Sequence, residues 1–132
     1  GFTDMPMNHK VFLAQFDAIK KLASEGPCVM VGRCADYALS EYKDCFSVFV
    51  HADTDWRINR LSQKHNKTAK EAKDMINKTD KSRSSYYNYY TNKKWGAASS
   101  YNLCVDSSKL GIDGATKAII QAIEIFDSIK NK

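Results

Sequence analysis

Cationic side chains are the residues of this 132-residue sequence whose types and spacing are best suited to chemistry. From Asp55 to Trp95 there are eleven lysines and arginines against four acids, an excess of seven where the whole chain carries only +5. Arg33 lies outside this segment and directly follows a short apolar run, residues 27–32. A guanidinium forks onto phosphate or carboxylate oxygens. The charge pattern therefore predicts an anionic partner.

Aromatic residues lie beside this positive charge. The stretch "TDKSRSSYYNYYTNKKWG", residues 79–96, places Tyr86, Tyr87, Tyr89 and Tyr90 within five positions. One interpretation is a helix that buries the rings and leaves the hydroxyls in water. The other is a surface on which bases stack while the cations hold a phosphate backbone. The local sequence allows both.

Other catalytic chemistries find little support. The four cysteines contain no Cys-x-x-Cys pair, and Cys28, Cys45 and Cys104 lie in β-rich apolar runs that predict reduced core residues. The three histidines are far apart in sequence, and for His51, at the end of a predicted strand, a structural role is favoured. We therefore expect no metal site built from these side chains and no catalytic triad.

The elements that position the cations follow from the apolar pattern. Three short runs without alternation predict strands buried on both faces: residues 27–32, 45–52 and 102–107. A helix is predicted over 8–25, with Phe12, Phe16, Ile19 and Ala23 on one apolar stripe. Further helices are predicted after Asp53 or Thr54 and from Thr68, where "TAKE" fits a capping box. The last helix is expected to begin at Asp113, with a core stripe of Ile119, Ile123 and Phe126.

Strands alternating with helices predict an α/β fold with a parallel sheet. In such sheets ligands bind beyond the carboxyl ends of the strands. Three groups of residues occupy those ends: Gly32-Arg33, His51-Ala52-Asp53 and Asp106-Ser107-Ser108. Arg33 is the most informative of them, because a guanidinium that follows a buried strand and a glycine projects toward the ligand crevice.

The order of these features resembles the cytidylate-kinase-like family of P-loop nucleoside-monophosphate kinases. The stretches that carry the resemblance are "GPCVMVGRCADYAL", "VFVHADTDWRINRL", "DKSRSSYYNYYTNKKWG" and "YNLCVDSSKLGIDG", which together span most of the chain. The resemblance implies a three-layer parallel sheet and phosphoryl transfer from ATP, with Mg²⁺, to a nucleoside monophosphate. It also implies one domain over residues 1–132, with a helical lid at about 54–96.

The resemblance implies roles for individual residues. The phosphate of the acceptor nucleotide would be clamped by Arg33, and Asp36 and Asp80 would also bind the acceptor. The transferring phosphates would meet four cations of the lid: Arg57, Arg60, Lys81 and Arg83. The adenine of ATP would pack on Asp106, Ser107 and Ser108. Cys34 stands where cytidylate kinases carry an acid, so the acceptor base stays open.

The phosphate-binding loop of these kinases, Gly-x-x-x-x-Gly-Lys-Ser/Thr, does not occur in the sequence. Its nearest imitation, "GIDGATK", has the wrong spacing and is better explained as the start of the last helix. By resemblance, the loop and the strand before it would lie upstream of Gly1. We therefore expect a C-terminal portion of the domain with an incomplete sheet, unable alone to transfer phosphate at a useful rate.

The missing strand would lie between the runs 27–32 and 45–52. Unpaired backbone at buried edges is costly, so these runs are expected to close together or to be completed by another chain or segment, in a dimer for example. No apolar run approaches the length of a membrane span, and no leader begins the sequence, so a cytoplasmic protein without membrane contact is expected. A nonenzymatic nucleotide-binding protein is the main alternative. A single-stranded nucleic-acid binder is disfavoured.

Overall fold

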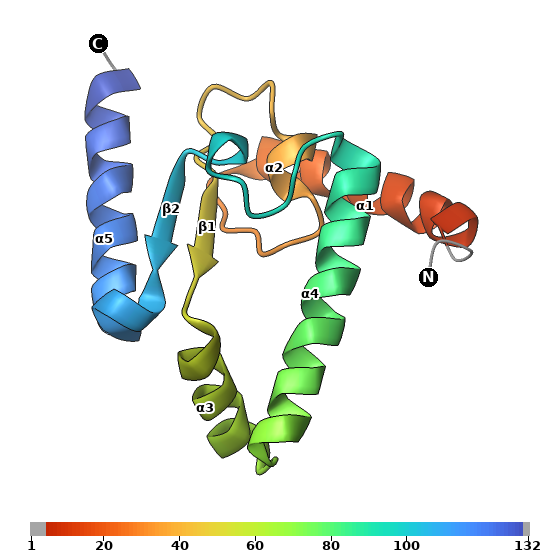
Figure 1. Cartoon of the computed structure of the whole chain (residues 1–132). Coiled ribbons are helices and arrows are strands. Elements are labelled where there is room, and N and C mark those ends of the chain that lie inside the picture. Colours follow the sequence, from red (N-terminus) through yellow and green to blue (C-terminus); the bar gives the residue numbers. More distant parts are fainter. Residues whose placement is uncertain (1–4, 131–132) are drawn as a thin grey trace.

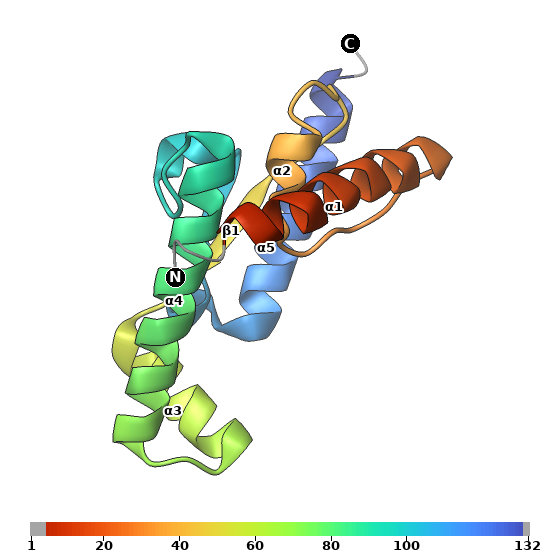
Figure 2. The same cartoon turned by 90° about the vertical axis from the view of Figure 1, so that its right-hand side faces the viewer.

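The structure is a computed structural model that describes residues 5–130. Two strands form a small sheet: β1 (Val48–His51) and β2 (Leu103–Asp106). The helices are α1 (Met5–Glu25), α2 (Ala35–Ala38), α3 (Thr54–His65), α4 (Ala69–Thr91) and α5 (Ser107–Lys130), with one 3₁₀ turn, η2 (Ala98–Ser100). In Figure 1, α5 lies along one side of the strands and α3 and α4 form an arm below and beside them, whereas Figure 2 shows α1 extending across the molecule.

The sheet confirms the α/β fold with parallel strands, although both strands are shorter than predicted. Val48 pairs with Leu103 and His51 pairs with Asp106, so the carboxyl ends of the two strands lie side by side. Near their amino ends, the carbonyl oxygen of Ser47 accepts hydrogen bonds from the backbone N–H groups of residues 102 and 103. Helix α5 packs on both strands. The three-layer sheet that the resemblance implies needs more strands than these two, so it stays a prediction.

The strand predicted for residues 27–32 is wrong. The segment joins no sheet, and the side chains of Val29 and Val31 are 93% and 89% exposed. A strand requires a neighbour, and one edge of β1 is taken by β2 while no other described residue pairs with the second edge. The expectation that this run would close against β1 is therefore also wrong. Completion of the sheet by another strand stays a prediction.

The first helix and the last helix differ in how well their sequences predicted them. In α1 the expected stripe is confirmed, because Phe12 and Ile19 are buried and Phe16 is half-buried. Helix α5 begins at Ser107, and Gly111, with a φ of 74°, divides it into a short first part and a long second part. The long part starts after Gly111, close to Asp113, where the last helix is predicted to begin. Of its predicted stripe Ile119, Ile123 and Phe126, the second is 38% exposed and the others are half-buried.

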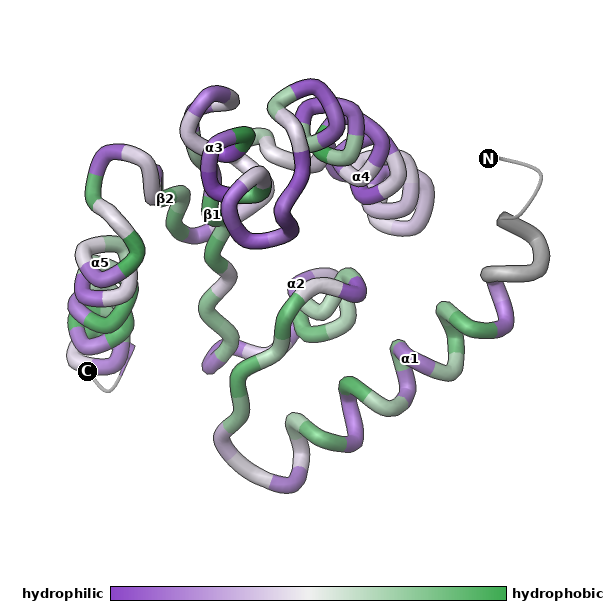
Figure 3. The backbone as a smooth tube through the Cα atoms, turned by 90° about the horizontal axis from the view of Figure 1, so that it is seen from below, coloured by the Kyte–Doolittle hydropathy of each residue, from purple (hydrophilic) through white to green (hydrophobic). Residues whose placement is uncertain are grey.

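The buried core is small. One cluster joins α1 to α2, and a second joins Phe12, Cys34 and Tyr87. The solvent-accessible surface is 9640 Å², whereas a compact monomer of 14.9 kDa exposes about 7,000 Å². Figure 3 shows where apolar residues lie: they recur along α1 and α5, whereas α3 is largely hydrophilic. The described chain is therefore more open than a compact domain of its size.

The capping box at the start of α4 is confirmed. The hydroxyl oxygen of Thr68 accepts a hydrogen bond from the Glu71 N–H at 3.1 Å, and the Glu71 carboxylate accepts one from the Thr68 N–H at 3.0 Å. These bonds satisfy backbone donors that an uncapped helix leaves unpaired, and they lower the pKa of Glu71.

We expect Thr68→Ala to lower the free energy of unfolding by about 1 kcal/mol, because the cap hydrogen bond is lost. Urea unfolding followed by circular dichroism measures this. Asp53→Ala is the matched control, since Asp53 precedes α3 but its side chain makes no cap hydrogen bond. Equal losses in the two variants would show that the box contributes nothing specific.

Candidate functional site

The carboxyl ends of the two strands are tied together by polar contacts. The Asp53 N–H donates to the hydroxyl oxygen of Ser108 at 3.0 Å, and the Ser107 hydroxyl donates to the carbonyl oxygen of His51 at 3.3 Å. Asp106 accepts hydrogen bonds from the Ser108 hydroxyl and, at 2.9 Å, from the Ser108 N–H. The segment after β1 and the start of α5, which directly follows β2, are thus held together.

These bonds favour the ionised form of Asp106. Hydrogen bonding from Ser108, chiefly from its hydroxyl, lowers the pKa of Asp106, so the carboxylate is ionised at neutral pH. The structure thus brings together Asp106, Ser107 and Ser108, the three residues predicted to contact adenine. Their polar groups bond mainly to each other and to the strand ends. The contact with adenine stays a prediction.

Arg57 lies in the first turn of α3, close in sequence to the end of β1, and pairs with Asp80 of α4. Its Nη1 and Nη2 atoms each donate to one carboxylate oxygen at 2.7 Å. The side chains are 32% and 26% exposed. The hydrogen bonds to Asp80 raise the pKa of Arg57, which stays protonated. The two residues, predicted for phosphate and acceptor, therefore form one bidentate pair between two helices.

The remaining predicted cations of the arm are more exposed. The guanidinium carbon of Arg60 lies 5.6 Å from the centroid of the Trp56 ring, a cation–π arrangement. Lys81 and Arg83 follow Asp80 on α4 and are exposed. Neither makes an ion pair within residues 5–130. Their charges are available to an anion, and their predicted roles stay predictions.

Arg33 occupies an unusual turn. Gly32, Arg33 and Cys34 have φ values of 72°, 58° and 57°, three successive left-handed residues before α2. The Arg33 side chain is exposed and lines a largely apolar hollow of about 250 Å³ between α1 and the segment before α2. Burial is the main cause of the raised pKa of Tyr86, and the charge of Arg33 opposes that rise.

If the predicted phosphate-binding arginines Arg33, Arg57 and Arg83 act on one ligand, they should line a common hollow near the carboxyl ends of the strands. Neither of the two best-formed hollows of the described chain contains Arg33 together with Arg57 or Arg83. The arginines are therefore distributed over three elements: the turn before α2, the start of α3 and the body of α4. A shared phosphate site among them stays a prediction.

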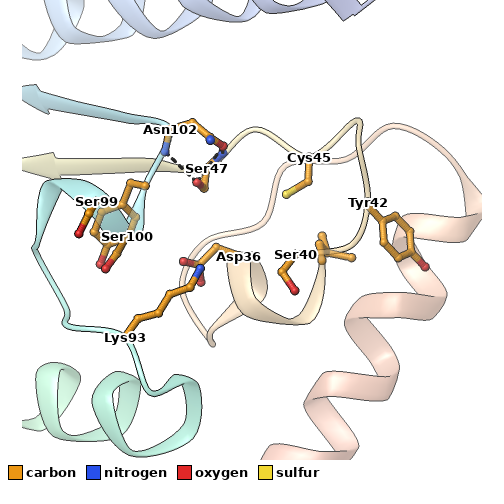
Figure 4. Close-up of a pocket in the computed structure, with 11 residues that line it drawn as sticks. Asp36, Ser40, Tyr42, Cys45, Ser47, Lys93, Ser99, Ser100 and Asn102 are labelled. Atoms are coloured by element: carbon orange, nitrogen blue, oxygen red, sulfur yellow. Dashed lines mark hydrogen bonds between the residues drawn. The ribbon is translucent and has the colours of Figure 1, made fainter.

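Asp36 lies at a different place from the other predicted residues. The Tyr87 hydroxyl donates to its carboxylate at 2.7 Å. Asp36 and Lys93 line a polar hollow of about 230 Å³ beside Ser47 and Asn102, where Lys93 extends toward Asp36 (Figure 4). Because Ser47 and Asn102 precede β1 and β2, this hollow lies at the amino ends of the strands. A role for Asp36 in acceptor binding stays a prediction.

The tyrosine cluster packs against α1. The rings of Phe12 and Tyr90 stack with centroids 4.0 Å apart, and the Tyr86 hydroxyl donates to the Gln15 side chain at 3.3 Å. Tyr87 is 6% exposed, whereas Tyr89 is 52% exposed. The interpretation that the tyrosines bury their rings is confirmed for Tyr87, whereas Tyr86 and Tyr90 are only half-buried. The hydroxyls of Tyr86 and Tyr87 bond to protein side chains instead of lying in water. This packing against α1 favours a structural role over base stacking.

The cysteines and acids of the described chain hold no evident metal site. Cys28 is exposed, so its assignment to the core is wrong, because the run that contains it joins no sheet. Cys45 and Cys104 are half-buried, and burial raises the pKa of Cys34 to about 11. No group of three or more potential ligands occurs within residues 5–130.

None of the helices described is long and apolar enough to cross a bilayer.

Comparisons with known proteins agree with the fold. A family model described as the cytidylate kinase-like family matches residues 1–109. A crystal structure of an uncharacterized protein from Eubacterium ventriosum ATCC 27560 is similar, with 34% sequence identity and a TM-score of 0.85. The match covers 89% of this chain and 74% of that one. No curated protein matches.

Proposed function

Because this chain belongs to the cytidylate kinase-like family, we propose that it binds a nucleoside monophosphate and supplies cations for phosphoryl transfer from ATP. The observation that carries the proposal is the left-handed turn that presents Arg33 to solvent. In the proposed reaction, an oxygen of the acceptor phosphate attacks the γ-phosphorus of ATP, and ADP leaves.

The turn at residues 32–34 supports a clamp for the acceptor phosphate. A left-handed conformation costs a residue with a β-carbon roughly 1–2 kcal/mol, and Arg33 and Cys34 both adopt it. Such strain is found at ligand clamps, where it holds a side chain in a productive position. Gly32 enters the turn without that cost. The guanidinium that results is exposed and suited to two phosphate oxygens.

The arm supports the second half of the proposal. Phosphoryl transfer demands positioning and stabilisation of negative charge more than a nucleophile from the protein. Arg57 and Arg60 lie on α3, which begins shortly after the carboxyl end of β1. Lys81 and Arg83 lie on α4, the helix that packs against α3. Mg²⁺ in such sites is held by substrate phosphates, water and one or two carboxylates, so we expect the bound nucleotides to supply much of its coordination.

Isothermal titration of this chain with CMP, UMP and AMP tests the proposal. We expect saturable binding of at least one of them, weakened about tenfold or more by Arg33→Ala, since hydrogen bonds to charged groups contribute about 1.5–3 kcal/mol. Lys117→Ala, which removes an exposed charge from α5, is the control and should bind like the wild type.

Two results would contradict this. Absence of saturable binding by the wild type would remove the nucleotide site, and unchanged affinity in Arg33→Ala would remove the clamp. A nonenzymatic nucleotide binder would pass the titration and show no phosphoryl transfer when the whole protein is assayed with ATP. A nucleic-acid binder would instead prefer longer oligonucleotides and weaken steeply with salt.

A further inference from the structure

The pair between Arg57 and Asp80 assigns a role that the sequence did not. The two residues are 23 positions apart and lie on different helices, and their contact is end to end and bidentate. Within residues 5–130 it is the one ion pair that joins α3 to α4. An acceptor-binding carboxylate was expected at position 80, yet both of its oxygens already face a guanidinium.

We propose that Asp80 is a positioning residue, which holds Arg57 in the orientation that receives a phosphate, rather than a residue that contacts the acceptor. The inference rests on the proposed function, because it assumes that the arm binds phosphate. It differs from that function in what it assigns: Asp80 acts through Arg57.

The donor count of the guanidinium supports this role. Arginine carries five N–H donors. The pair uses one on Nη1 and one on Nη2, so three remain, among them the Nε–H and a second Nη hydrogen that form the side edge. No described residue accepts a hydrogen bond from the Arg57 Nε. Arg57 can therefore hold Asp80 with its end and two phosphate oxygens with its side.

The ion pair also reduces the side-chain entropy that Arg57 loses when phosphate binds. A free arginine side chain carries about 2 kcal/mol of rotamer entropy. Two hydrogen bonds of 2.7 Å fix the guanidinium before any ligand arrives. The opposite role is also physically possible, in which Asp80 competes as an internal anion and weakens phosphate binding. The two roles predict opposite signs for the effect of removing the Asp80 charge.

The test titrates the full chain with inorganic tripolyphosphate and follows the Arg57 Nε–H signal by NMR. We expect that signal to shift saturably in the wild type and the affinity to fall about tenfold in Asp80→Asn. Asp74→Asn is the matched control, because it removes the same charge from an exposed position of α4 without touching Arg57. It should bind tripolyphosphate as well as the wild type or slightly better.

A charge exchange separates positioning from mere stabilisation. The double variant Arg57→Asp/Asp80→Arg re-forms the ion pair with its ends exchanged. We expect it to recover the unfolding midpoint that Asp80→Asn loses, while tripolyphosphate affinity stays about tenfold below the wild type. If the double variant fails to fold, Asp80→Asn and Asp74→Asn still give the sign of the effect.

Three outcomes would overturn the inference: equal or tighter binding by Asp80→Asn, full recovery of affinity in the double variant, or no response of the Arg57 signal in the wild type. The proposed function fails separately, through nucleotide titration of Arg33→Ala. Tripolyphosphate binding at Arg57 without nucleotide binding would sustain the role of Asp80 and reject the nucleotide site.

Discussion

Replacing Phe12 by alanine is expected to lower the free energy of unfolding by about 3–5 kcal/mol, the usual range for the loss of a buried aromatic side chain. Phe12 is 7% exposed, stacks on Tyr90 at 4.0 Å and meets Tyr86 edge to face. Its removal leaves a cavity at the contact between α1 and α4. Urea unfolding followed by tyrosine fluorescence and circular dichroism measures the change.

Leu13→Ala is the matched control for this prediction. Leu13 is the next residue of the same helix and is 49% exposed, so its truncation should cost less than about 1 kcal/mol. Similar losses at the two positions would mean that α1 does not dock through Phe12. A loss confined to Phe12 would show that the tyrosine cluster and α1 form one packed unit.

Stability should also fall steeply in alkaline solution. Burial, and then the hydrogen bond to Asp36, raise the pKa of Tyr87. Tyr87 is therefore neutral in the folded chain at a pH where the unfolded chain ionises it, near pH 10. Its contribution is complete below that pH and is lost above it, by about 1.4 kcal/mol per pH unit. The pKa values of Tyr86, Tyr90 and Tyr101 are raised too, so they act in the same direction.

Tyr87→Phe tests the origin of this alkaline loss. At neutral pH the variant should be less stable by about 1.5–3 kcal/mol, because Asp36 loses a hydrogen-bond donor at 2.7 Å. Its stability should then decline less with pH than that of the wild type, since one titrating group is gone. Tyr89→Phe, at a 52% exposed position, is the control and should keep the wild-type slope. Equal slopes in all three proteins would assign the decline to other groups.

The sequence predicted those parts of the fold that depend on short-range patterns. The apolar stripe of α1, the capping box at Thr68 and the strand before Asp106 each follow from residues within a few positions of one another. The strand at 27–32 failed for the opposite reason. Its apolar residues satisfy the local pattern, but a strand exists only where a neighbour offers hydrogen bonds, and the described chain offers none there.

The candidate site shows the same division. The residues at the strand ends were found because parallel strands place their carboxyl ends at one edge. The contacts between Arg57 and Asp80 and between Asp36 and Tyr87 join positions 23 and 51 residues apart. Nothing local in the sequence indicates which acid meets which partner, because the partner is set by how the helices pack. Both acids were consequently predicted to contact the substrate.

The large accessible surface of the folded chain has a consequence for the energetics of the whole molecule. Two quantities scale with the surface that unfolding newly exposes. One is the heat capacity change on unfolding, and the other is the slope of the free energy of unfolding against denaturant concentration. A folded chain with 9640 Å² already in contact with solvent has less left to expose than a compact domain of equal length. We therefore expect a broad unfolding transition and a stability curve that is comparatively flat with temperature.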